Sequence, residues 1–362
     1  MSGYDKAIAG AGPAGSVFAL LAARAGYRVL LIEKSTLPAR RIVETAPPEL
    51  RPMLSGLGLE HLTHPPSCRE APELVSVWGT SEPSARSHIF SPYGSGMHFD
   101  RRRLDKALAE AARDAGADLR VGRAARFTRH PRGGYIAELG DARERCRIAI
   151  LATGRCGGGR GLPYARRYLD DQVAVAGQFV SPNRHSESRM LVEAIPGGWF
   201  YLAGLPDDST MAVLLTRASL VPAQRRERLR WYLERLARTS IIRQSLNGCA
   251  LPQQVSVTNA RACVARPFIG GHWLAIGDAR IALDPLTGRG LLWAIDDAIT
   301  TARLLTTVTW QELAERVQTQ TSRELQSYLD QRSRVYAAEQ RFGRDGYWSS
   351  VQTFRIQRNF LP

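Results

Sequence analysis

The feature that most constrains this fold is a glycine-rich turn close to the N-terminus. Residues 4–9 have the pattern of a buried strand, Gly10-Ala11-Gly12-Pro13-Ala14-Gly15 follows, and a helical pattern then runs to about Ala25 before a second strand at 28–32. In such a unit the first glycine permits a tight turn, the second lets the backbone approach a pyrophosphate, and the third lets helix and strand pack closely. Glu33 ends the second strand, where a carboxylate binds a ribose hydroxyl. The unit therefore predicts a Rossmann-like fold that holds a dinucleotide at a helix N-terminus.

A second glycine-rich segment lies near the other end of the chain. Residues 273–276 have the pattern of a short buried strand and lead into Gly277-Asp278, and Pro285-Leu286-Thr287-Gly288-Arg289-Gly290 then opens an apolar helix. The two segments thus occur in this order at opposite ends of the chain.

Together these segments resemble those of the para-hydroxybenzoate-hydroxylase-like flavoproteins. The resemblance implies a non-covalently held FAD, with Asp278 on a ribityl hydroxyl. It also implies that the backbone of residues 285–290, which we call the flavin loop, lies along the pyrimidine edge of the flavin. The dipole of the helix that begins at Gly290 then favours the negative charge of reduced flavin.

Two shorter segments resemble the same family. In Asp100-Arg101-Arg102-Arg103-Leu104-Asp105 the family's FAD-contacting arginine corresponds to Arg101, and Ala152-Thr153-Gly154 corresponds to a turn beside the FAD. The residues expected to contact FAD are Gly10, Gly12, Pro13, Ala14, Gly15, Glu33, Lys34, Arg41, Arg101, Ala152, Gly154, Gly277, Asp278, Pro285, Gly288 and Gly290.

The predicted fold class is α/β, with two interleaved domains. A Rossmann-like FAD-binding domain of the glutathione-reductase type is expected to comprise residues 1–40, 100–165 and 265–310. A substrate-binding domain with a mixed β-sheet comprises 41–99 and 166–264, and a C-terminal helical segment comprises 311–362. Long helices are predicted at 290–305 and 310–342. This interleaving predicts a ligand pocket at the domain boundary.

Other segments are similar to a narrower branch of the tryptophan-halogenase-like flavoproteins. The segments are Trp78-Gly79 and residues 92–101, 191–194, 198–201 and 336–342, whereas residues 44–52 resemble a segment of the halogenase-like flavoproteins as a whole. This branch includes the flavoproteins that mature tryptophylquinone enzymes by hydroxylating a tryptophan side chain within a partner protein. The resemblance implies the same activity here, with O₂ activated as a flavin C4a-hydroperoxide that passes one oxygen atom to the ring.

Candidate catalytic and substrate-binding residues follow from this resemblance. A general acid or base is expected at Glu44, His98 or Asp284, and an aromatic substrate pocket at Trp78, Tyr93, Trp199 and Tyr201. Each has a structural alternative. Glu44 would pair with a nearby arginine at the surface, His98 would be a buried structural histidine, Asp284 would only orient the flavin loop, and the aromatic rings would be core.

Two other functions stay open. The first is hydroxylation or halogenation of a small or carrier-bound aromatic natural-product precursor. Flavin halogenases place a lysine between flavin and substrate, whereas Lys6, Lys34 and Lys106 all belong to the nucleotide end, and the halogenase signature Trp-x-Trp-x-Ile-Pro is missing. The second is a flavoprotein that serves as a binding or chaperone module.

The electron donor also stays open. Gly154-Arg155-Cys156 replaces the Asp-Gly motif that the hydroxylases of the family use with NAD(P)H. Direct reduction by NAD(P)H and supply of electrons by a separate NAD(P)H flavin reductase are therefore both retained.

Composition limits the partners. The net charge is +15, and the densest basic segment, residues 225–243, has the pattern of a solvated helix face that suits an acidic protein. It lacks any nucleic-acid-binding motif, so no nucleic-acid partner is expected. No apolar run approaches ~18 residues and the N-terminus leads straight into a strand, so we expect a soluble cytoplasmic protein without a membrane partner. Five cysteines without Cys-x-x-Cys spacing predict no metal site.

Overall fold

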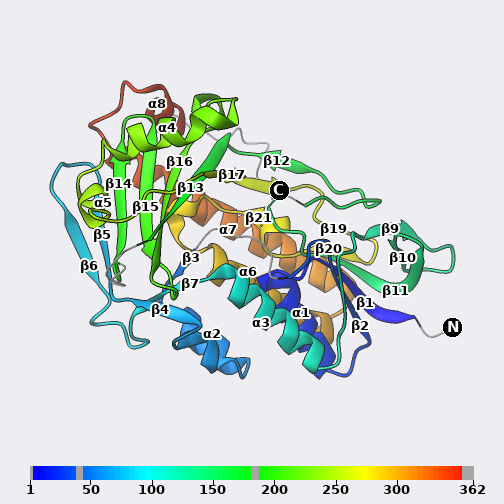
Figure 1. Cartoon of the computed structure of the whole chain (residues 1–362). Coiled ribbons are helices and arrows are strands. Elements are labelled where there is room, and N and C mark those ends of the chain that lie inside the picture. Colours follow the sequence, from blue (N-terminus) through cyan, green and yellow to red (C-terminus); the bar gives the residue numbers. More distant parts are fainter. Residues whose placement is uncertain (1–2, 38–43, 156, 181–186, 353–362) are drawn as a thin grey trace.

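Two large β-sheets organise the molecule, and each draws strands from distant parts of the sequence (Figure 1). The structure is a computed structural model that describes residues 3–37, 44–155, 157–180 and 187–352. The predicted α/β class is confirmed: a Rossmann-like sheet with helices is combined with a mixed sheet.

The first sheet has eight strands and contains the predicted dinucleotide-binding unit. Its order is β19-β20-β11-β1-β2-β8, with β10 beside β11 and β9 beside β10. Neighbours in the series β20-β11-β1-β2-β8 are parallel, whereas β9, β10 and β11 form an antiparallel meander. The strands are β1 (Tyr4–Ala9), β2 (Val29–Glu33), β8 (Asp118–Val121), β9 (Arg126–Arg129), β10 (Tyr135–Leu139), β11 (Ala142–Leu151), β19 (Ile269–Gly270) and β20 (Trp273–Ala275).

Three helices share one core with this sheet: α1 (Pro13–Arg24), α3 (Arg101–Asp114) and α6 (Gly290–Thr307). Phe18 of α1, Leu108 of α3 and Ile295 of α6 are buried in that core. α3 begins several residues earlier than the apolar pattern alone indicates, because the Asp100 side chain accepts a hydrogen bond from the backbone N–H of Arg102 and caps the helix.

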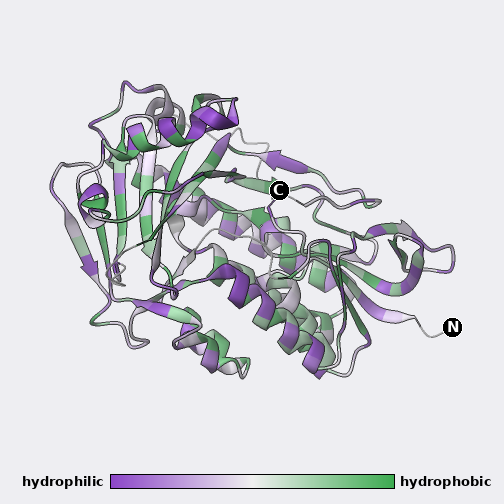
Figure 2. Cartoon of the chain, in the orientation of Figure 1, coloured by the Kyte–Doolittle hydropathy of each residue, from purple (hydrophilic) through white to green (hydrophobic). Residues whose placement is uncertain are grey.

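The second sheet has seven strands in the order β17-β13-β16-β15-β14-β5-β6, and it is mixed because β5 and β14 are parallel. Helices α4 (Arg225–Leu236) and α5 (Ile241–Ser245) pack on one face, and α7 (Trp310–Ala338) and α8 (Gly346–Gln352) pack on the other. Figure 2 shows hydrophobic strands in both sheets and many hydrophilic residues on α4. The strands are β5 (Glu73–Val77), β6 (Ser84–Ser87), β13 (Gln172–Val180), β14 (Met190–Ile195), β15 (Gly198–Gly204), β16 (Ser209–Arg217) and β17 (Ser256–Asn259).

Helix α7 ends at Ala338, before the predicted end at 342. Glu339 has an extended backbone, with φ −85° and ψ 99°, and its carboxylate accepts hydrogen bonds from the backbone N–H groups of Gly79 and Arg341. These contacts with a distant loop stop the helix, and the local pattern carries no sign of them.

Two three-stranded sheets lie beside the large ones. One has the order β3-β7-β4 and the other β12-β18-β21. The remaining elements are β3 (Glu44–Ala46), β4 (Cys68–Ala71), β7 (Gly96–Phe99), β12 (Arg166–Tyr168), β18 (Cys263–Ala265), β21 (Ile281–Ala282), α2 (Leu50–Gly56) and the short 3₁₀ turns η1 (Glu60–Thr63), η2 (Ala218–Leu220), η3 (Gly277–Ala279) and η4 (Pro285–Thr287).

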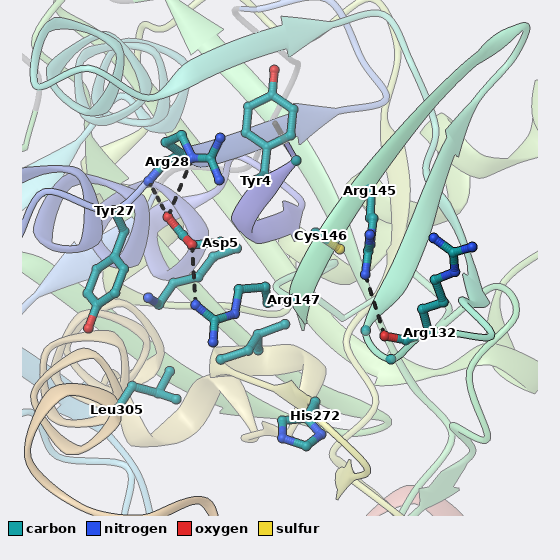
Figure 3. Close-up of a pocket in the computed structure, with 15 residues that line it drawn as sticks. Tyr4, Asp5, Tyr27, Arg28, Arg132, Arg145, Cys146, Arg147, His272 and Leu305 are labelled. Atoms are coloured by element: carbon teal, nitrogen blue, oxygen red, sulfur yellow. Dashed lines mark hydrogen bonds and ion pairs between the residues drawn. The ribbon is translucent and has the colours of Figure 1, made fainter. Parts of the chain in front are cut away.

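A pocket of about 690 Å³ lies where β1 begins, beside β11 (Figure 3). The glycine-rich turn follows the opposite end of β1, so this pocket and the predicted cofactor site lie at different ends of the same strands. No helix in the described ranges has the length and hydropathy needed to cross a bilayer.

Candidate FAD site and the polar network behind it

Three segments far apart in the sequence meet at the end of β1. Gly10 has a φ of +109°, and a Cβ placed on it would lie 2.2 Å from the carbonyl oxygen of Ala152. A Cβ on Gly277 would lie 2.7 Å from the Cβ of Ala14. Both positions therefore need glycine because another segment passes so close. The structure thus brings together the two glycine-rich segments and the turn at 152–154.

Two other glycines of these segments face open space. A Cβ on Gly12 or on Gly288 would meet no atom within 4 Å. Gly12 precedes α1 and Gly288 lies just before α6, and no side chain caps either helix N-terminus. Unshielded N–H groups at a helix N-terminus favour an anionic or acceptor group. These features suit an FAD whose pyrophosphate lies at Gly12 and whose flavin edge lies at Gly288.

The two acids of the predicted site are held in fixed orientations. Glu33 accepts hydrogen bonds from the backbone N–H groups of Ala11 (2.9 Å) and Ser35 (3.0 Å). The Asp278 carboxylate lies 3.4 Å from the Arg155 guanidinium, and its side chain is 25% exposed. Each carboxylate oxygen has more than one lone pair, so both acids can still accept a hydroxyl group.

Arg155 is a site residue that the sequence reasoning missed. Its guanidinium donates to the backbone carbonyls of Ala260 (3.0 Å), Arg261 (3.0 Å) and Leu283 (2.8 Å), in addition to pairing with Asp278. It therefore joins the turn at 152–154 to the loop that leads to the flavin. The available signal was the arginine in place of the Asp-Gly motif, which we interpreted only as a loss.

The other expected FAD contacts have varied surroundings. Arg101 forms an ion pair with Asp105 at 3.0 Å. Lys34 is exposed directly after β2, whereas Arg41 lies outside the described residues. Pro13 begins α1 and Pro285 begins η4. Gly15 lies in the first turn of α1, where an added Cβ would lie 1.9 Å from the carbonyl oxygen of Gly10.

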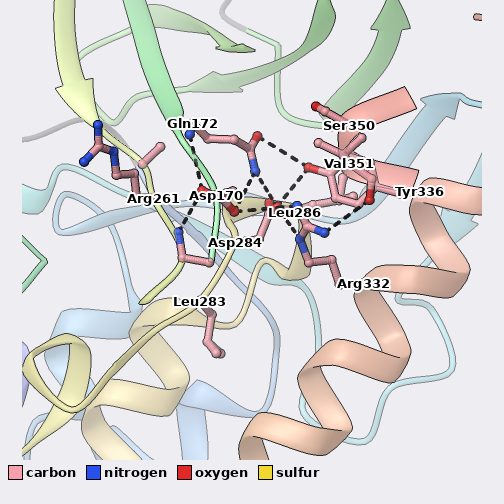
Figure 4. A network of polar contacts seen from close by, with 12 residues as sticks. Asp170, Gln172, Arg261, Leu283, Asp284, Leu286, Arg332, Tyr336, Ser350 and Val351 are labelled. Carbon is pink, nitrogen blue, oxygen red and sulfur yellow. Dashed lines mark hydrogen bonds and ion pairs between the residues drawn. The ribbon is translucent and has the colours of Figure 1, made fainter. Parts of the chain in front are cut away.

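Asp284 lies in a buried polar network behind the flavin loop (Figure 4). Its Oδ1 accepts the backbone N–H of Leu286 at 2.9 Å and thereby caps η4. Its Oδ2 accepts from the Gln172 side chain (2.6 Å), the Tyr336 hydroxyl (2.9 Å) and the Arg332 guanidinium (3.3 Å). The network therefore links helix α7 to the loop between Asp284 and Gly290.

A second carboxylate shares the same arginine. Asp170 Oδ2 lies 3.6 Å from Arg332 Nη2. Burial, and after it the charge of Asp284, raises the pKa of Asp170 to about 6. Burial also raises the pKa of the Tyr336 hydroxyl well above its usual value. Two acids thus compete for one guanidinium, and the tyrosine hydroxyl remains a hydrogen-bond donor.

His98 lies in the middle strand of the β3-β7-β4 sheet and is fully buried. Its Nδ1 is 2.8 Å from the Thr45 hydroxyl and its Nε2 is 3.2 Å from the Ser188 carbonyl. Because a carbonyl only accepts, Nε2 carries the proton and Nδ1 accepts from Thr45. Burial lowers the pKa of His98 to about 4, so the ring is neutral at pH 7. Glu44 lies beside it in β3, opposite Phe99 in the register.

Three of the four predicted substrate residues lie in one aromatic cluster. Trp78 is 6.1 Å from Trp199 and 5.2 Å from Trp348 between ring centroids, in edge-on geometry, and Tyr201 lies 6.2 Å from Trp199. The cluster lies on the sheet face that α7 and α8 cover, and Leu286 of the flavin loop packs against it. Tyr93 is 46% exposed in a loop after β6 and does not join these rings.

The indole N–H groups of this cluster are occupied. Trp78 donates to the Val335 carbonyl (2.8 Å), Trp348 to the Ile195 carbonyl (2.8 Å) and Trp199 to the Tyr336 hydroxyl (3.2 Å). Tyr336 therefore contacts both the aromatic cluster and Asp284. Trp348 and Tyr336 were not among the predicted site residues, although they come from the segments that cover the cluster.

Comparisons with known proteins agree with this architecture. Residues 8–49 match the family model of an NAD(P)-binding Rossmann-like domain. The chain is 25% identical to LodB, a protein assigned as an FAD-dependent oxidoreductase in Marinomonas mediterranea, over 98% of each chain.

Two solved structures share the fold over almost the whole chain. The myxobacterial chondrochloren halogenase CndH superposes with a TM-score of 0.86 at 20% identity, covering 99% of this chain and 87% of that chain. The peptidyl tryptophan dihydroxylase QhpG, essential for tryptophylquinone cofactor biogenesis, superposes with a TM-score of 0.81 at 20% identity, covering 99% of this chain and 80% of that chain.

The fold, the converging glycine-rich turns and these similarities define an FAD-dependent oxidoreductase. The chain shares its fold with a flavin-dependent halogenase and with a peptidyl tryptophan dihydroxylase, in agreement with the resemblance that the sequence motifs indicated.

Proposed function

We propose that this enzyme is an FAD-dependent monooxygenase that hydroxylates an electron-rich aromatic ring, namely a tryptophan side chain of a partner protein. The observation that carries this proposal is the contact between the flavin loop and the aromatic face of the second sheet, through Leu286. The similarity to QhpG, a peptidyl tryptophan dihydroxylase, supports the same substrate class.

The residues at the glycine-rich turns fit the cofactor. The N-terminus of α1 at Gly12 would hold the pyrophosphate, Glu33 a ribose hydroxyl and Asp278 a ribityl hydroxyl. When bound, FAD supplies the activation of O₂ and the transfer of one oxygen atom. Arg155 orients Asp278 through their ion pair, and the apolar core that contains the aromatic cluster would exclude water from its side of the flavin loop.

The three acid–base candidates differ in how far their polar atoms are already used in hydrogen bonds. Asp284 and His98 already use their polar atoms in hydrogen bonds, so a proton transfer at either would require one of these bonds to open. Glu44 lies in β3 next to Thr45 and opposite Phe99, and we retain it as the candidate for accepting a proton from the substrate ring. We assign Asp284 the positioning of the flavin loop.

The positions of the lysines favour hydroxylation over halogenation. Lys6 borders the pocket at the start of β1, Lys34 is exposed after β2, and Lys106 pairs with Glu110 at 3.7 Å on α3. None of the three lies in the aromatic cluster or in the flavin loop. A lysine that captures an oxidised halide would have to lie between those two features.

We further propose a cytoplasmic location and a separate flavin reductase as electron donor. Cys68, Cys146 and Cys263 are buried free thiols, as is typical of a reducing compartment. Arg155 fills the position of the Asp-Gly motif that other hydroxylases use with NAD(P)H. Its guanidinium already contacts three backbone carbonyls and Asp278.

The test is mass spectrometry of tryptophan-containing candidate partners after incubation with the enzyme, FAD, a flavin reductase, NADH and ¹⁸O₂, with catalase present to remove free peroxide. We expect a tryptophan that gains one labelled oxygen atom. Addition of bromide should leave the product unchanged. A bromide-dependent halogenated product would contradict the proposal, as would the absence of any oxygenated product from every partner tested.

A further inference from the structure

The pocket at the start of β1 is remote from the predicted FAD contacts. The residues that line it come from β1, the turn before β2, the β10 hairpin, β11, the β19–β20 turn and the end of α6, and none of them is an expected FAD contact. Gly10 follows Lys6 by four positions along β1, which is about 13 Å at the rise of an extended strand. A ligand here would therefore be separate from FAD.

Positive charge dominates this pocket. Its lining includes five cationic side chains and one carboxylate, namely Lys6, Arg28, Arg132, Arg145, Arg147 and Asp5 (Figure 3). Asp5 is shared: its oxygens lie 3.9 Å from Arg28 and 3.9 Å from Arg147. Arg145 donates to the backbone carbonyl of Arg132 at 3.4 Å, and neither of these arginines forms an ion pair with a described residue. The pocket thus has a large excess of donors over acceptors.

Lys6 is the most deeply placed of these cations. It is 4% exposed, and its ammonium lies 2.9 Å from the centre of the Tyr27 ring. Within the described part of the chain the ammonium has no hydrogen-bond or ion-pair partner. Burial lowers its pKa to about 8. Burying an ammonium whose N–H groups have no acceptor costs free energy, and a bound ligand that supplies an acceptor would offset this cost.

The remaining walls are partly apolar. Ile148, Leu305 and the Tyr27 ring line the pocket together with His272, whose ring stacks on Trp310 at 5.1 Å. A volume of about 690 Å³ suits a small organic molecule. A ligand that matches these walls has an anionic group and a flat or apolar body.

We propose that this pocket is a second binding site, which takes a small organic oxyanion with its phosphate or carboxylate at Lys6 and Arg147 and its body against Tyr27 and Ile148. The ammonium and the guanidinium donate charge-assisted hydrogen bonds to the anion. The proposal is independent of the reaction at the flavin.

The test uses the FAD-saturated protein, so that the cofactor site cannot bind the ligand. Isothermal titration calorimetry compares inorganic phosphate, adenosine monophosphate and benzoate as ligands. We expect at least one of the two organic anions to bind more tightly than inorganic phosphate. The variant Lys6→Met should weaken that binding roughly tenfold or more, because a charge-assisted donor is lost.

The control is Lys106→Met, which removes an exposed lysine on α3 and should leave the affinity unchanged. Absence of binding by all three anions to the unmodified protein, or equal affinity of Lys6→Met and the unmodified protein, would overturn the proposal. A retained FAD content in Lys6→Met excludes misfolding as the cause of weaker binding.

A second readout follows the ammonium itself. The chain has three lysines, so ¹⁵N-labelled lysine side chains give few NMR signals, and Lys6→Met identifies the one from Lys6. Bound oxyanion should raise the pKa of Lys6 above about 8, while the other two lysines keep theirs. An unchanged Lys6 titration under saturating ligand would also contradict the proposal. The titratable and charged groups that share the pocket with Lys6 are Tyr4, Asp5, Tyr27, Arg28, Arg132, Arg145, Cys146, Arg147 and His272.

Discussion

Individual side chains near the proposed site are held by partners that fix their protonation as well as their position. His98 is the clearest case, because Thr45 and the Ser188 carbonyl use both of its ring nitrogens. Burial keeps its pKa at about 4, well below the value of about 6.5 expected in an unfolded chain. The imidazole of His98 is therefore mainly neutral in the folded protein at pH values above about 4.

The pKa of His98 predicts an acid-dependent loss of stability. As pH falls below about 6.5 the unfolded chain takes up a proton first, so the contribution of His98 to the free energy of unfolding declines and is lost by about pH 4. The loss is ~3 kcal/mol between pH 7 and pH 4. Urea unfolding at a series of pH values measures it, with His98→Gln as a variant that keeps a donor but does not titrate.

The comparison has to be made as a difference between the two proteins. Asp170 has a raised pKa of about 6, so its contribution changes in the opposite direction over an overlapping pH range. Subtracting the His98→Gln curve from the unmodified curve removes that contribution. Parallel curves for the two proteins would show that His98 is not buried in its neutral form.

At the scale of elements, helix α7 supports the flavin loop from behind. Arg332 and Tyr336 lie one turn apart on this helix, and both donate to the carboxylate that caps η4. The Leu286 side chain on the same loop packs against the aromatic cluster. The loop is therefore fixed by a polar contact through Asp284 and an apolar contact through Leu286.

This arrangement predicts a large effect of Arg332→Met. Removing the guanidinium leaves Asp170 and Asp284 buried without their cation, which costs ~3–5 kcal/mol in the free energy of unfolding at pH 8. The cost should shrink at pH 5, because a carboxyl that binds a proton no longer needs the arginine. Denaturant unfolding at both pH values gives the two numbers.

Arg334→Met is the matched control, since Arg334 lies on the exposed side of the same helix. Its effect should stay within about 0.5 kcal/mol. If Arg332→Met were as stable as this control at pH 8, the network would not be a stabilising support of the loop.

At the scale of the whole molecule, the cofactor segments lie at both ends of the sequence. FAD that bridges them should stabilise the entire chain, by ~2.7 kcal/mol when free FAD is 100 times its Kd. We expect added FAD to raise Tm equally when unfolding is followed by tryptophan fluorescence, which reports on Trp273 in the first sheet and Trp199 in the second, and by far-ultraviolet circular dichroism.

Gly12→Ala should abolish most of this increase while the cofactor-free protein keeps its Tm, because the added methyl group meets no protein atom and projects into the space assigned to the pyrophosphate. Gly56→Ala is the matched control, since a Cβ there also meets no atom within 4 Å. An FAD-dependent rise in Tm that survives in Gly12→Ala would refute the location of the pyrophosphate.

The sequence was sufficient for the features that depend on local patterns. The turn at 10–15, Glu33, Gly277-Asp278 and the α/β class follow from spacing and periodicity. The network around Arg332 could not be predicted, because Arg332 pairs with Asp170 and Gln172 donates to Asp284 across more than a hundred residues of sequence. Trp78 and Trp199 were predicted to lie in the site, but Trp348, whose ring packs on Trp78, is separated from both by long stretches of chain.

The order of strands in the first sheet has a consequence for biosynthesis. Strand β11, complete at Leu151, pairs along its outer edge with β20, whose first residue is Trp273. During translation β10 can cover this edge at Ala142–Cys146, but the part at Ala149–Leu151 stays unpaired until more than a hundred further residues have been added. We therefore expect the nucleotide-binding sheet to be completed, and FAD to be bound, only after most of the chain has been synthesised.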